Sequence, residues 1–301
     1  MSGVYKGQPW VVCPAVHTEM WENPGVQANI ATLRSRGVHI VEPEAGRLAG
    51  GDTGTGRLAA PERILAAIVR VLSGGDLAGT HVVVSAGGTR EPIDAVRVIA
   101  NRSSGKQGYA IAAEASARGA QVTLVSTVDL AVPFGVTVLA VETAAQMEAA
   151  LTGLAPAADV VVMAAAVADF RPVAAVPGKI QQDQGVPQTV PEPTPDILAG
   201  LGATKPAGQV LVGFAAETSD LLVHAAAKLQ RKHLDLIVAN DVAAPGVGFQ
   251  HDTNAVTLLG ADGTTRTVAL ADKRAIAKAV LDTVVEIRGR DQPPHPPLPT
   301  S

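Results

Sequence analysis

Two glycine-rich turns and several polar and basic side chains follow one apolar run of the sequence. The run HVVVS leads directly into AGGTREPIDAVRVIANRSSGKQG, residues 86–108. Because glycine lacks Cβ, the backbone N–H groups at Gly87 and Gly88 can approach an anion closely. The segment fits neither the dinucleotide pattern G-x-G-x-x-G nor the P-loop pattern G-x-x-x-x-G-K-[ST]. The glycines alone are as compatible with an ordinary tight turn as with a ligand site.

The second half of this segment favours a phosphate site. Ser103, Ser104 and Gly105 come directly before a predicted helix, and the free N–H groups and dipole of a helix N-terminus attract an anion. Arg102 and Lys106 add positive charge nearby. We therefore interpret the segment as a polyphosphate cradle.

Three further segments offer parts of a nucleotide site. AAAVADF, residues 164–170, ends an apolar run in small side chains that leave room for a flat ligand, with Asp169 beside it; close helix packing, with Asp169 as a capping residue, is the alternative. Lys179 lies in a long loop rich in Pro, Gly and Gln, which is typical of a lid, although a lone lysine is more often a solvated charge. Lys228 and Lys232 lie at helical spacing, where a basic stripe favours triphosphate contact over a merely solvated face.

Composition and motif content argue against several other classes. The formal net charge of −4 gives no basic field for nucleic acid, and no apolar run is long enough to predict membrane insertion. One cysteine, no G-x-S-x-G elbow and no H-E-x-x-H spacing give little support to a hydrolase or a zinc enzyme. A further hypothesis, an NAD(P)-dependent reductase, rests only on the analogy of a strand, a turn and a helix. We expect a cytoplasmic protein.

The elements that must position these residues follow a regular order from Gly79 onward. Apolar runs of strand length alternate with helical patterns at residues 108–118, 144–154, 220–233 and 272–288. Such alternation predicts right-handed βαβ units in an α/β fold with a doubly wound, mostly parallel, Rossmann-like sheet. Ligands bind such sheets beyond the carboxyl ends of the strands, where AGGTREP is expected to lie. The strand-like runs are HVVVS, AQVTLVS, VTVLAVE, DVVVMAAAVA, QVLVGFAAE, LDLIVAND and NAVTLLG.

The first 75 residues hold too few elements for a complete sheet domain. They contain two strand-like runs, two helical patterns and the glycine-rich loop GRLAGGDTGTGRL. A two-stranded unit of this size is marginal alone, because it buries little surface and leaves its edges unpaired. We predict three parts: a partial segment at residues 1–75, a larger domain at 76–290 and a disordered Pro-rich tail at 291–301.

Several motifs in order resemble one family, the phosphopantothenate-cysteine ligases of coenzyme A biosynthesis. The resemblance spans residues 79–287 and implies CTP-dependent amide formation by a homodimer. The carboxylate of 4'-phosphopantothenate would attack the α-phosphate of CTP, and the amine of L-cysteine would then displace CMP from the acyl-cytidylate. A non-catalytic nucleotide-binding scaffold is the alternative. The motifs are AGGTREPID, NRSSGKQGYA, AAAVADFRP, KIQQ, TPDIL, VGFAAET, KLQRKHLDLIVAND and FQHDTNAV.

The resemblance also implies roles for individual residues. Asn101 would hold the acyl-cytidylate, and Lys179 would stabilise charge on the α-phosphate. The family commonly has Lys-Ile-Lys-Lys where this chain has KIQQ, so only Lys179 of its lysines is retained. Five residues would cradle the phosphates: Gly87, Gly88, Ser103, Ser104 and Gly105.

The base and the distal phosphates would be held elsewhere in the same site. Asp169, with the backbone around Ala165 and Phe214, would accept a hydrogen bond from the exocyclic amine of cytosine and so select against uracil. Lys228 and Lys232 would reach the distal phosphates. Mg²⁺ is expected on the triphosphate, held mainly by phosphate oxygens and water, and the resemblance identifies no protein ligand for it.

The N-terminal portion resembles the end of the phosphopantothenoylcysteine decarboxylase that is fused ahead of this ligase in most bacteria, and so implies a partial flavodoxin-like segment. Val16 and His17 stand where that family has Met and Asn, and Gly50 where it has a reactive Cys. We therefore do not expect decarboxylation by this chain alone and expect FMN only in a full-length decarboxylase. A truncated start or a fragment of a bifunctional protein would explain the pattern.

Overall fold

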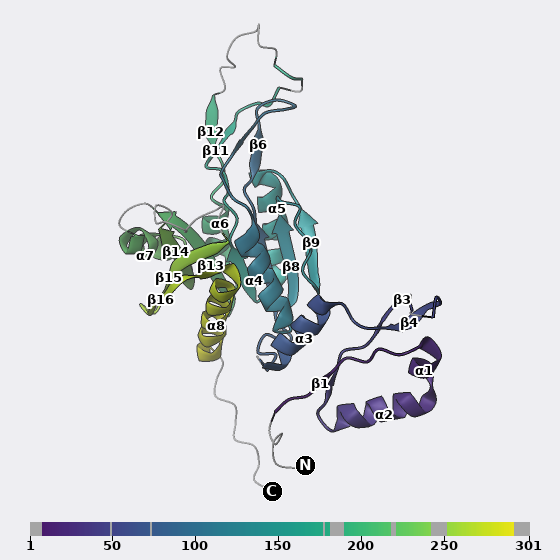
Figure 1. Ribbon diagram of the computed structural model, residues 1–301. Helices are drawn as coiled ribbons and strands as arrows, with labels where there is room; N and C mark the ends of the chain where they lie inside the picture. Colours follow the sequence, from purple (N-terminus) through teal and green to yellow (C-terminus); the bar gives the residue numbers. More distant parts are fainter. Residues whose placement is uncertain are drawn as a thin grey trace. The chain divides into compact units, whose positions relative to one another are not determined.

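The computed structural model describes residues 8–48, 50–72, 74–176, 178–180, 190–217, 221–241 and 252–291. The chain divides into two compact units, one of residues 1–78 with 116–119 and the other of residues 79–115 with 120–301 (Figure 1). The predicted Pro-rich tail lies outside the described residues except for Asp291, which ends the last helix.

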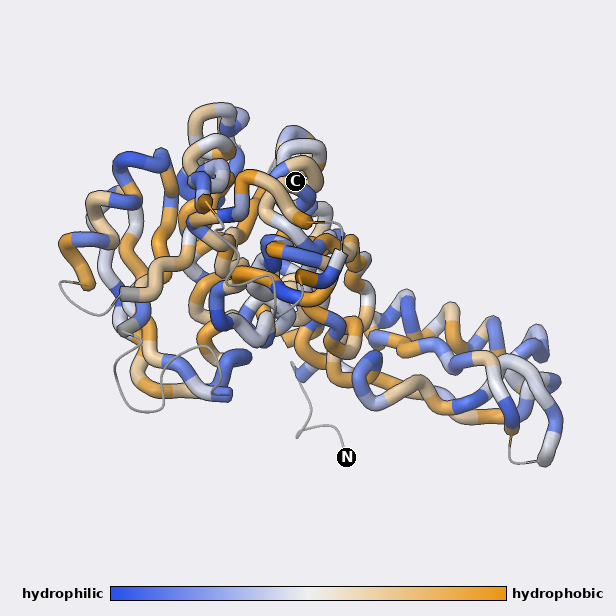
Figure 2. Tube along the Cα trace, turned by 90° about the horizontal axis from the view of Figure 1, so that it is seen from above, coloured by the Kyte–Doolittle hydropathy of each residue, from blue (hydrophilic) through white to orange (hydrophobic). Residues whose placement is uncertain are grey.

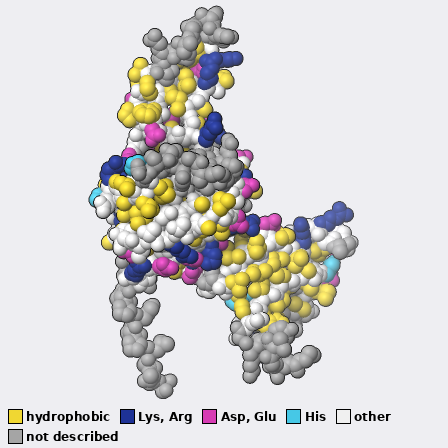
Figure 3. Space-filling view, turned by 60° about the vertical axis from the view of Figure 1, so that its left-hand side comes forward, with side chains coloured by type: hydrophobic (Ala, Val, Ile, Leu, Met, Phe, Trp, Pro, Cys, Tyr) yellow, Lys and Arg dark blue, Asp and Glu magenta, His cyan; other side chains and the backbone are white. Residues whose placement is uncertain are grey.

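In its described residues, the smaller unit contains short strands and three helices. β1 (Val11–Val12) pairs in parallel with β2 (His39–Ile40). The helices are α1 (Thr18–Glu22), α2 (Pro24–Ser35) and α3 (Pro61–Leu72). Leu65, Ile68 and Leu72 of α3 are exposed, and Figure 3 shows hydrophobic side chains gathered on the surface of this unit.

The glycine-rich stretch of the smaller unit is a hairpin and not the loop that its composition indicates. β3 (Glu44–Arg47) pairs antiparallel with β4 (Thr53–Arg57). Gly51 has a φ of +95°, which glycine adopts without strain, and its N–H donates to the carbonyl of Leu48 to close the turn. Gly50 and Gly51 lie in the turn, and the other three glycines of the stretch, Gly46, Gly54 and Gly56, lie within β3 and β4.

The larger unit is built on an eight-stranded sheet in the order β16-β15-β14-β13-β10-β5-β8-β9. Six neighbouring strands of this sheet pair in parallel: β14, β13, β10, β5, β8 and β9. β15 and β16 are antiparallel to their neighbours. In chain order the six parallel strands run 3-2-1-4-5-6, which confirms the doubly wound fold and reverses direction between β5 and β10. The strands are β5 (His81–Ala86), β8 (Gln121–Ser126), β9 (Val136–Ala140), β10 (Val160–Met163), β13 (Val210–Glu217), β14 (Leu236–Asp241), β15 (Thr253–Gly260) and β16 (Thr265–Asp272).

Helices cover both faces of this sheet. One face carries Val83, Val161 and Leu211 against α5 (Ala144–Leu154), α6 (Ile197–Thr204) and α7 (Leu221–Arg231). The opposite face of the sheet packs against α4 (Lys106–Ala117) and α8 (Lys273–Asp291) (Figure 1). The short turn η1 (Ala155–Ala157) follows α5. Because side chains alternate between faces and both faces are buried, central strands are continuously apolar, as their orange colour indicates in Figure 2. Within the described residues, no helix is both long and apolar enough to cross a membrane.

Two antiparallel ribbons extend from one end of the sheet, and the sequence patterns did not predict them. β6 (Arg90–Pro92) pairs with β7 (Val98–Ala100), and β11 (Phe170–Pro172) pairs with β12 (Pro191–Pro193). β6 also contacts β11, so we call the two ribbons with their connections (residues 90–100 and 170–193, of which 177 and 181–189 are not described) the arm. Figure 3 shows hydrophobic side chains along the arm at the top of the view. The exposed ones are Val96, Val98, Phe170, Val173, Val176 and Val190.

Candidate functional site

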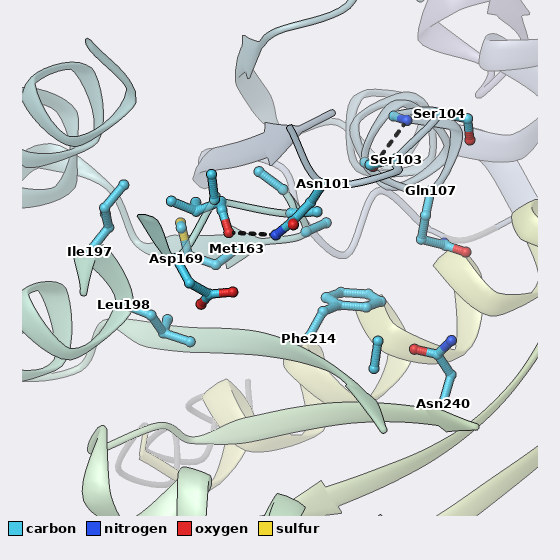
Figure 4. Close-up of a pocket in the computed structure, with 18 of the residues that line it drawn as sticks. Asn101, Ser103, Ser104, Gln107, Met163, Asp169, Ile197, Leu198, Phe214 and Asn240 are labelled. Atoms are coloured by element: carbon cyan, nitrogen blue, oxygen red, sulfur yellow. Dashed lines mark hydrogen bonds between the residues drawn. The ribbon is translucent and has the colours of Figure 1, made fainter. Parts of the chain in front are cut away.

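A cavity of about 390 Å³ opens where the strand order reverses, beyond the carboxyl ends of β5, β10, β13 and β14. This is the place where a doubly wound sheet offers its loops to a ligand. Of the residues predicted from the sequence, the cavity brings together Asn101, Ser103, Ser104, Gly105, Ala165, Asp169, Phe214 and Lys232. Figure 4 shows ten of the lining residues with labels.

The loop after β5 requires its two glycines. Gly87 has a φ of +89°, and a Cβ there would overlap Thr127. At Gly88 a Cβ would overlap the backbone carbonyl of Asn101. The loop is also bonded to the one after β10, because the N–H of Ala166 donates to the carbonyl of Gly87 at 2.8 Å. Tight packing against Thr127 and Asn101 explains why glycine stands at both positions. Gly87 therefore does not need to contact a ligand directly.

The polar end of the cavity is the start of α4. Ser103, Ser104 and Gly105 line it, and Gly105 has a φ of +72° that sets the entry to the helix. The backbone N–H of Gly105 lies 3.4 Å from Oγ of Ser103. Free N–H groups and serine hydroxyls at a helix N-terminus form a surface that accepts an anion.

The opposite end of the cavity combines a carboxylate, an aromatic ring and small side chains. Asp169 is exposed to the cavity, and Phe214 of β13 lies between it and Asn240 in Figure 4. Nδ2 of Asn101 donates to the carbonyl of Val167 at 2.9 Å, which fixes the Asn101 side chain between the two ends. The small residues 164–166 leave the space free for a flat group.

The predicted basic residues do not all reach this cavity. Lys232 lines it, with its Nζ 2.9 Å from Oδ1 of Asp196. Lys106 pairs with Asp252 at 2.6 Å, and Lys228 on α7 is half-buried away from the lining. Lys179 is exposed on the arm and is not a lining residue. The roles of these lysines stay predictions.

Asp196 caps α6 beside the cavity and is held there as a carboxylate. Its Oδ1 accepts the N–H of Ala199 at 3.1 Å and the ammonium of Lys232. Burial alone would raise the pKa of Asp196, but these hydrogen bonds and the lysine charge outweigh it and hold that pKa below its ordinary value. Lys232 therefore has a counter-ion before any ligand binds.

Four polar residues at the α4 end were missed from the sequence. Gln107, Asn240, Asn254 and Lys273 line the cavity, and the last three are buried. Oε1 of Gln107 is buried without a hydrogen-bond partner in the described part of the chain, as expected of an acceptor that serves a ligand. Burial, helped by the charge of Lys106, lowers the pKa of the Lys273 ammonium. The sequence did carry signals for three of these residues, because Gln107 and Asn254 lie within the motifs NRSSGKQGYA and FQHDTNAV and Asn240 ends a strand-like run; Lys273 gave no such signal.

A second cavity of about 340 Å³ lies behind the same loop. It shares Asn101, Ser103 and Ser104 with the first, and Arg102 lines only this one, together with Arg90. Arg102 therefore does not face the first cavity directly. No group of three or more His, Cys, Asp or Glu side chains among the described residues could hold a metal ion.

These features define a class: a doubly wound α/β protein with a cavity at its topological switch point, into which a helix N-terminus opens. A family model described as the DNA/pantothenate metabolism flavoprotein C-terminal domain matches residues 77–287, and one described as flavoprotein matches residues 2–73. The chain belongs to the family of coenzyme A biosynthesis bifunctional proteins CoaBC. The predicted resemblance to a family of coenzyme A biosynthesis is confirmed.

Individual relatives support this assignment. The CoaBC protein of Mycobacterium bovis is 46% identical over 294 residues, covering 92% of this chain and 70% of the relative. A cysteine/cysteine sulfinic acid decarboxylase from an unknown prokaryotic organism is 39% identical, covering 93% of this chain and 80% of the relative. The crystal structure of the C-terminal domain of a CoaBC protein is similar with a TM-score of 0.62 and 37% identity, covering 72% of this chain and 99% of that one.

Proposed function

We propose that this chain joins 4'-phosphopantothenate to L-cysteine in a CTP-dependent reaction. The observation that carries the proposal is the cavity at the switch point, which has an anion-accepting helix N-terminus at one end and Asp169 with Phe214 at the other. A nucleotide needs these two features, one for its phosphates and one for its base. Family membership supports the same chemistry.

The reaction has two balanced steps. A carboxylate oxygen of phosphopantothenate attacks the α-phosphorus of CTP, the bond to the β-phosphate breaks, and pyrophosphate leaves. The amine of cysteine then attacks the acyl carbonyl, CMP leaves with the bonding electrons, and the amine loses a proton. The chain would contribute position and charge stabilisation: Ser103, Ser104 and Gly105 toward the phosphates, and the Asn101 amide toward the activated acyl group.

Cofactor requirements follow from the residues present. With no cluster of metal ligands in the described residues, Mg²⁺ would be carried by the triphosphate, where it neutralises charge. Decarboxylation does not fit this chain's own residues, because His17, which pairs with Asp52, stands where the resemblance expects Asn, and Gly50 offers no thiol. We therefore propose FMN only for a full-length decarboxylase and propose no flavin step here.

We also propose a homodimer that acts in the cytoplasm. The exposed valines and Phe170 of the arm support the dimer, because apolar side chains gathered on one projecting element are typical of an interface. Mass measurement in solution tests this, and a strict monomer at micromolar concentration would exclude it. Fractionation of cells that express the chain tests the location.

Pyrophosphate release tests the proposed function directly. With CTP, phosphopantothenate and Mg²⁺, the chain should release pyrophosphate, and adding cysteine should yield CMP and the amide. A chain that binds CTP and never releases pyrophosphate would instead be a non-catalytic nucleotide-binding scaffold. Tight binding of a nicotinamide cofactor would instead favour the hypothesis of an NAD(P)-dependent reductase.

Replacing Asp169 with alanine should weaken the use of CTP and narrow the preference for CTP over UTP. The carboxylate accepts a hydrogen bond that cytosine can donate from its exocyclic amine and uracil cannot, and such a bond to a charged group contributes about 1.5–3 kcal/mol. The ratio of kcat/KM for the two nucleotides measures the effect. An unchanged ratio would leave Asp169 with a structural role only.

Replacing Lys273 with methionine should raise the Kd for CTP about tenfold or more, because it removes a buried positive charge beside the phosphate end and keeps the apolar stem. Since its pKa is lowered, Lys273 loses its proton at a lower pH than an ordinary lysine, so CTP affinity should fall as the pH rises through that value. Titration calorimetry at several pH values measures both effects. Lys278→Met, on the same helix with its side chain 65% exposed, is the matched control and should bind CTP as the parent protein does.

A further inference from the structure

A buried carboxylate lies on the arm, outside both cavities. Asp94 lies in the turn between β6 and β7, and its side chain is completely shielded from solvent. Its Oδ1 accepts the N–H groups of Val96 and Arg97, each at 2.7 Å. Its Oδ2 accepts Nη1 of Arg97 at 3.0 Å. The carboxylate thus organises its own turn and fixes one guanidinium.

The same carboxylate joins this turn to the segment that carries Lys179. The N–H of Ile180 lies 3.3 Å from Oδ2 of Asp94, and Nη1 of Arg97 donates to the carbonyl of Ile180 at 3.4 Å. A third link is the hydrogen bond of 3.0 Å from the N–H of Val176 to the carbonyl of Ile93. Both backbone polar groups of Ile180 are therefore held, one residue beyond Lys179.

We propose that Asp94 is a positioning residue that holds the backbone next to Lys179 and the guanidinium of Arg97 in one fixed arrangement. The Lys179 side chain is exposed, so among the described residues its backbone is the part that the fold holds most directly. The inference rests on the proposed function in one respect: if Lys179 serves the ligase reaction, its placement depends on Asp94.

The charge of Asp94 suits this role. Hydrogen bonds from the N–H of Val96, and then of Arg97 and Ile180, with the nearby Arg97 charge, outweigh the effect of burial and hold the pKa of Asp94 below its ordinary value. An ionised carboxylate accepts from all four donors. Asparagine has the same shape but only one side-chain oxygen. Its amide nitrogen is itself a donor and would face the donors of Arg97 and Ile180, so at least one of these hydrogen bonds would be lost.

The test compares Asp94→Asn with Asp282→Asn in the full chain. Asp282 pairs with Lys278 on α8, away from the cavities, and its variant should behave as the parent protein. In Asp94→Asn, amide hydrogen exchange at Ile180 should rise about tenfold, the rate of pyrophosphate release should fall about tenfold or more, and the Kd for CTP should stay within about twofold. Circular dichroism and the melting temperature check the fold.

A double-mutant cycle separates positioning from an independent contribution to stability. If Asp94 acts through Lys179, then Asp94→Asn with Lys179→Ala should be no more than about threefold slower than Lys179→Ala alone. Two results would overturn the proposal: losses of rate from the two substitutions that multiply in the double variant, or amide hydrogen exchange at Ile180 in Asp94→Asn that equals that of the parent protein. Should Asp94→Asn unfold, Arg97→Met, which removes the guanidinium that joins Asp94 to the carbonyl of Ile180 and leaves the backbone beside Lys179 unchanged, should lower the rate of pyrophosphate release and raise exchange at Ile180 in the same direction. If the parent protein releases no pyrophosphate, the ligase proposal fails, and hydrogen exchange still decides whether Asp94 anchors this segment.

Discussion

Replacing Lys179 with alanine is expected to slow formation of the acyl-cytidylate about a hundredfold or more, while the fold and the Kd for CTP, within about tenfold, are kept. Negative charge builds up on the α-phosphate in the transition state, and loss of a cation aimed at it costs roughly 3 kcal/mol of activation free energy. A lysine that is merely solvated would change stability or rate by about half a kcal/mol at most. Lys179 is exposed on the arm and outside the cavity lining, so the two interpretations predict very different results.

Single-turnover pyrophosphate release, with and without cysteine, measures this effect on each half-reaction. Lys179→Gln should be equally impaired, because it keeps length and polarity and lacks the charge. Lys278→Ala, another exposed lysine in the same unit, is the control and should react at the parental rate. Parental rates in both Lys179 variants would make Lys179 a bystander and direct attention to Arg102 or Lys106.

Replacing Gly88 with alanine should abolish most ligase activity and destabilise the larger unit by about 2 kcal/mol. The added Cβ would overlap the backbone carbonyl of Asn101, which cannot rotate away as a side chain could. Overpacking of this kind costs about 1–3 kcal/mol, and here it also displaces Asn101, which lines both cavities. A misplacement of about 1 Å at such a residue can cost on the order of a hundredfold in rate.

Gly153→Ala is the matched control for Gly88. Gly153 lies within α5, and a Cβ there meets no atom within 4 Å, so alanine should be neutral or stabilise the helix by about 0.5–1 kcal/mol. Urea unfolding and pyrophosphate release measure the two properties for both variants. Normal activity in Gly88→Ala would show that the loop can shift without moving Asn101.

The sequence determined the central sheet and the glycine loop of the site. Continuous apolar runs bounded by glycine and polar residues predict buried parallel strands, and right-handed connections then predict a doubly wound sheet, although the order of its strands came only from the structure. Gly87, Gly88 and the Ser103–Gly105 turn were recognised from their residue types, although the contacts that require glycine at residues 87 and 88 are with Thr127 and Asn101 farther along the chain.

Only the tertiary structure decided which distant residues complete the site and how the arm is built. β6, β7, β11 and β12 have three residues each, too few to show a period of two, and each exists because its partner strand lies beside it. Lys273 reaches the cavity because β15 and β16 add antiparallel strands and lead α8 back to the start of α4, where Gln107 donates to its carbonyl. Asp94 likewise acts through a hydrogen bond to a residue 86 positions away. Long-range pairing has no local signature, so these features needed the folded chain.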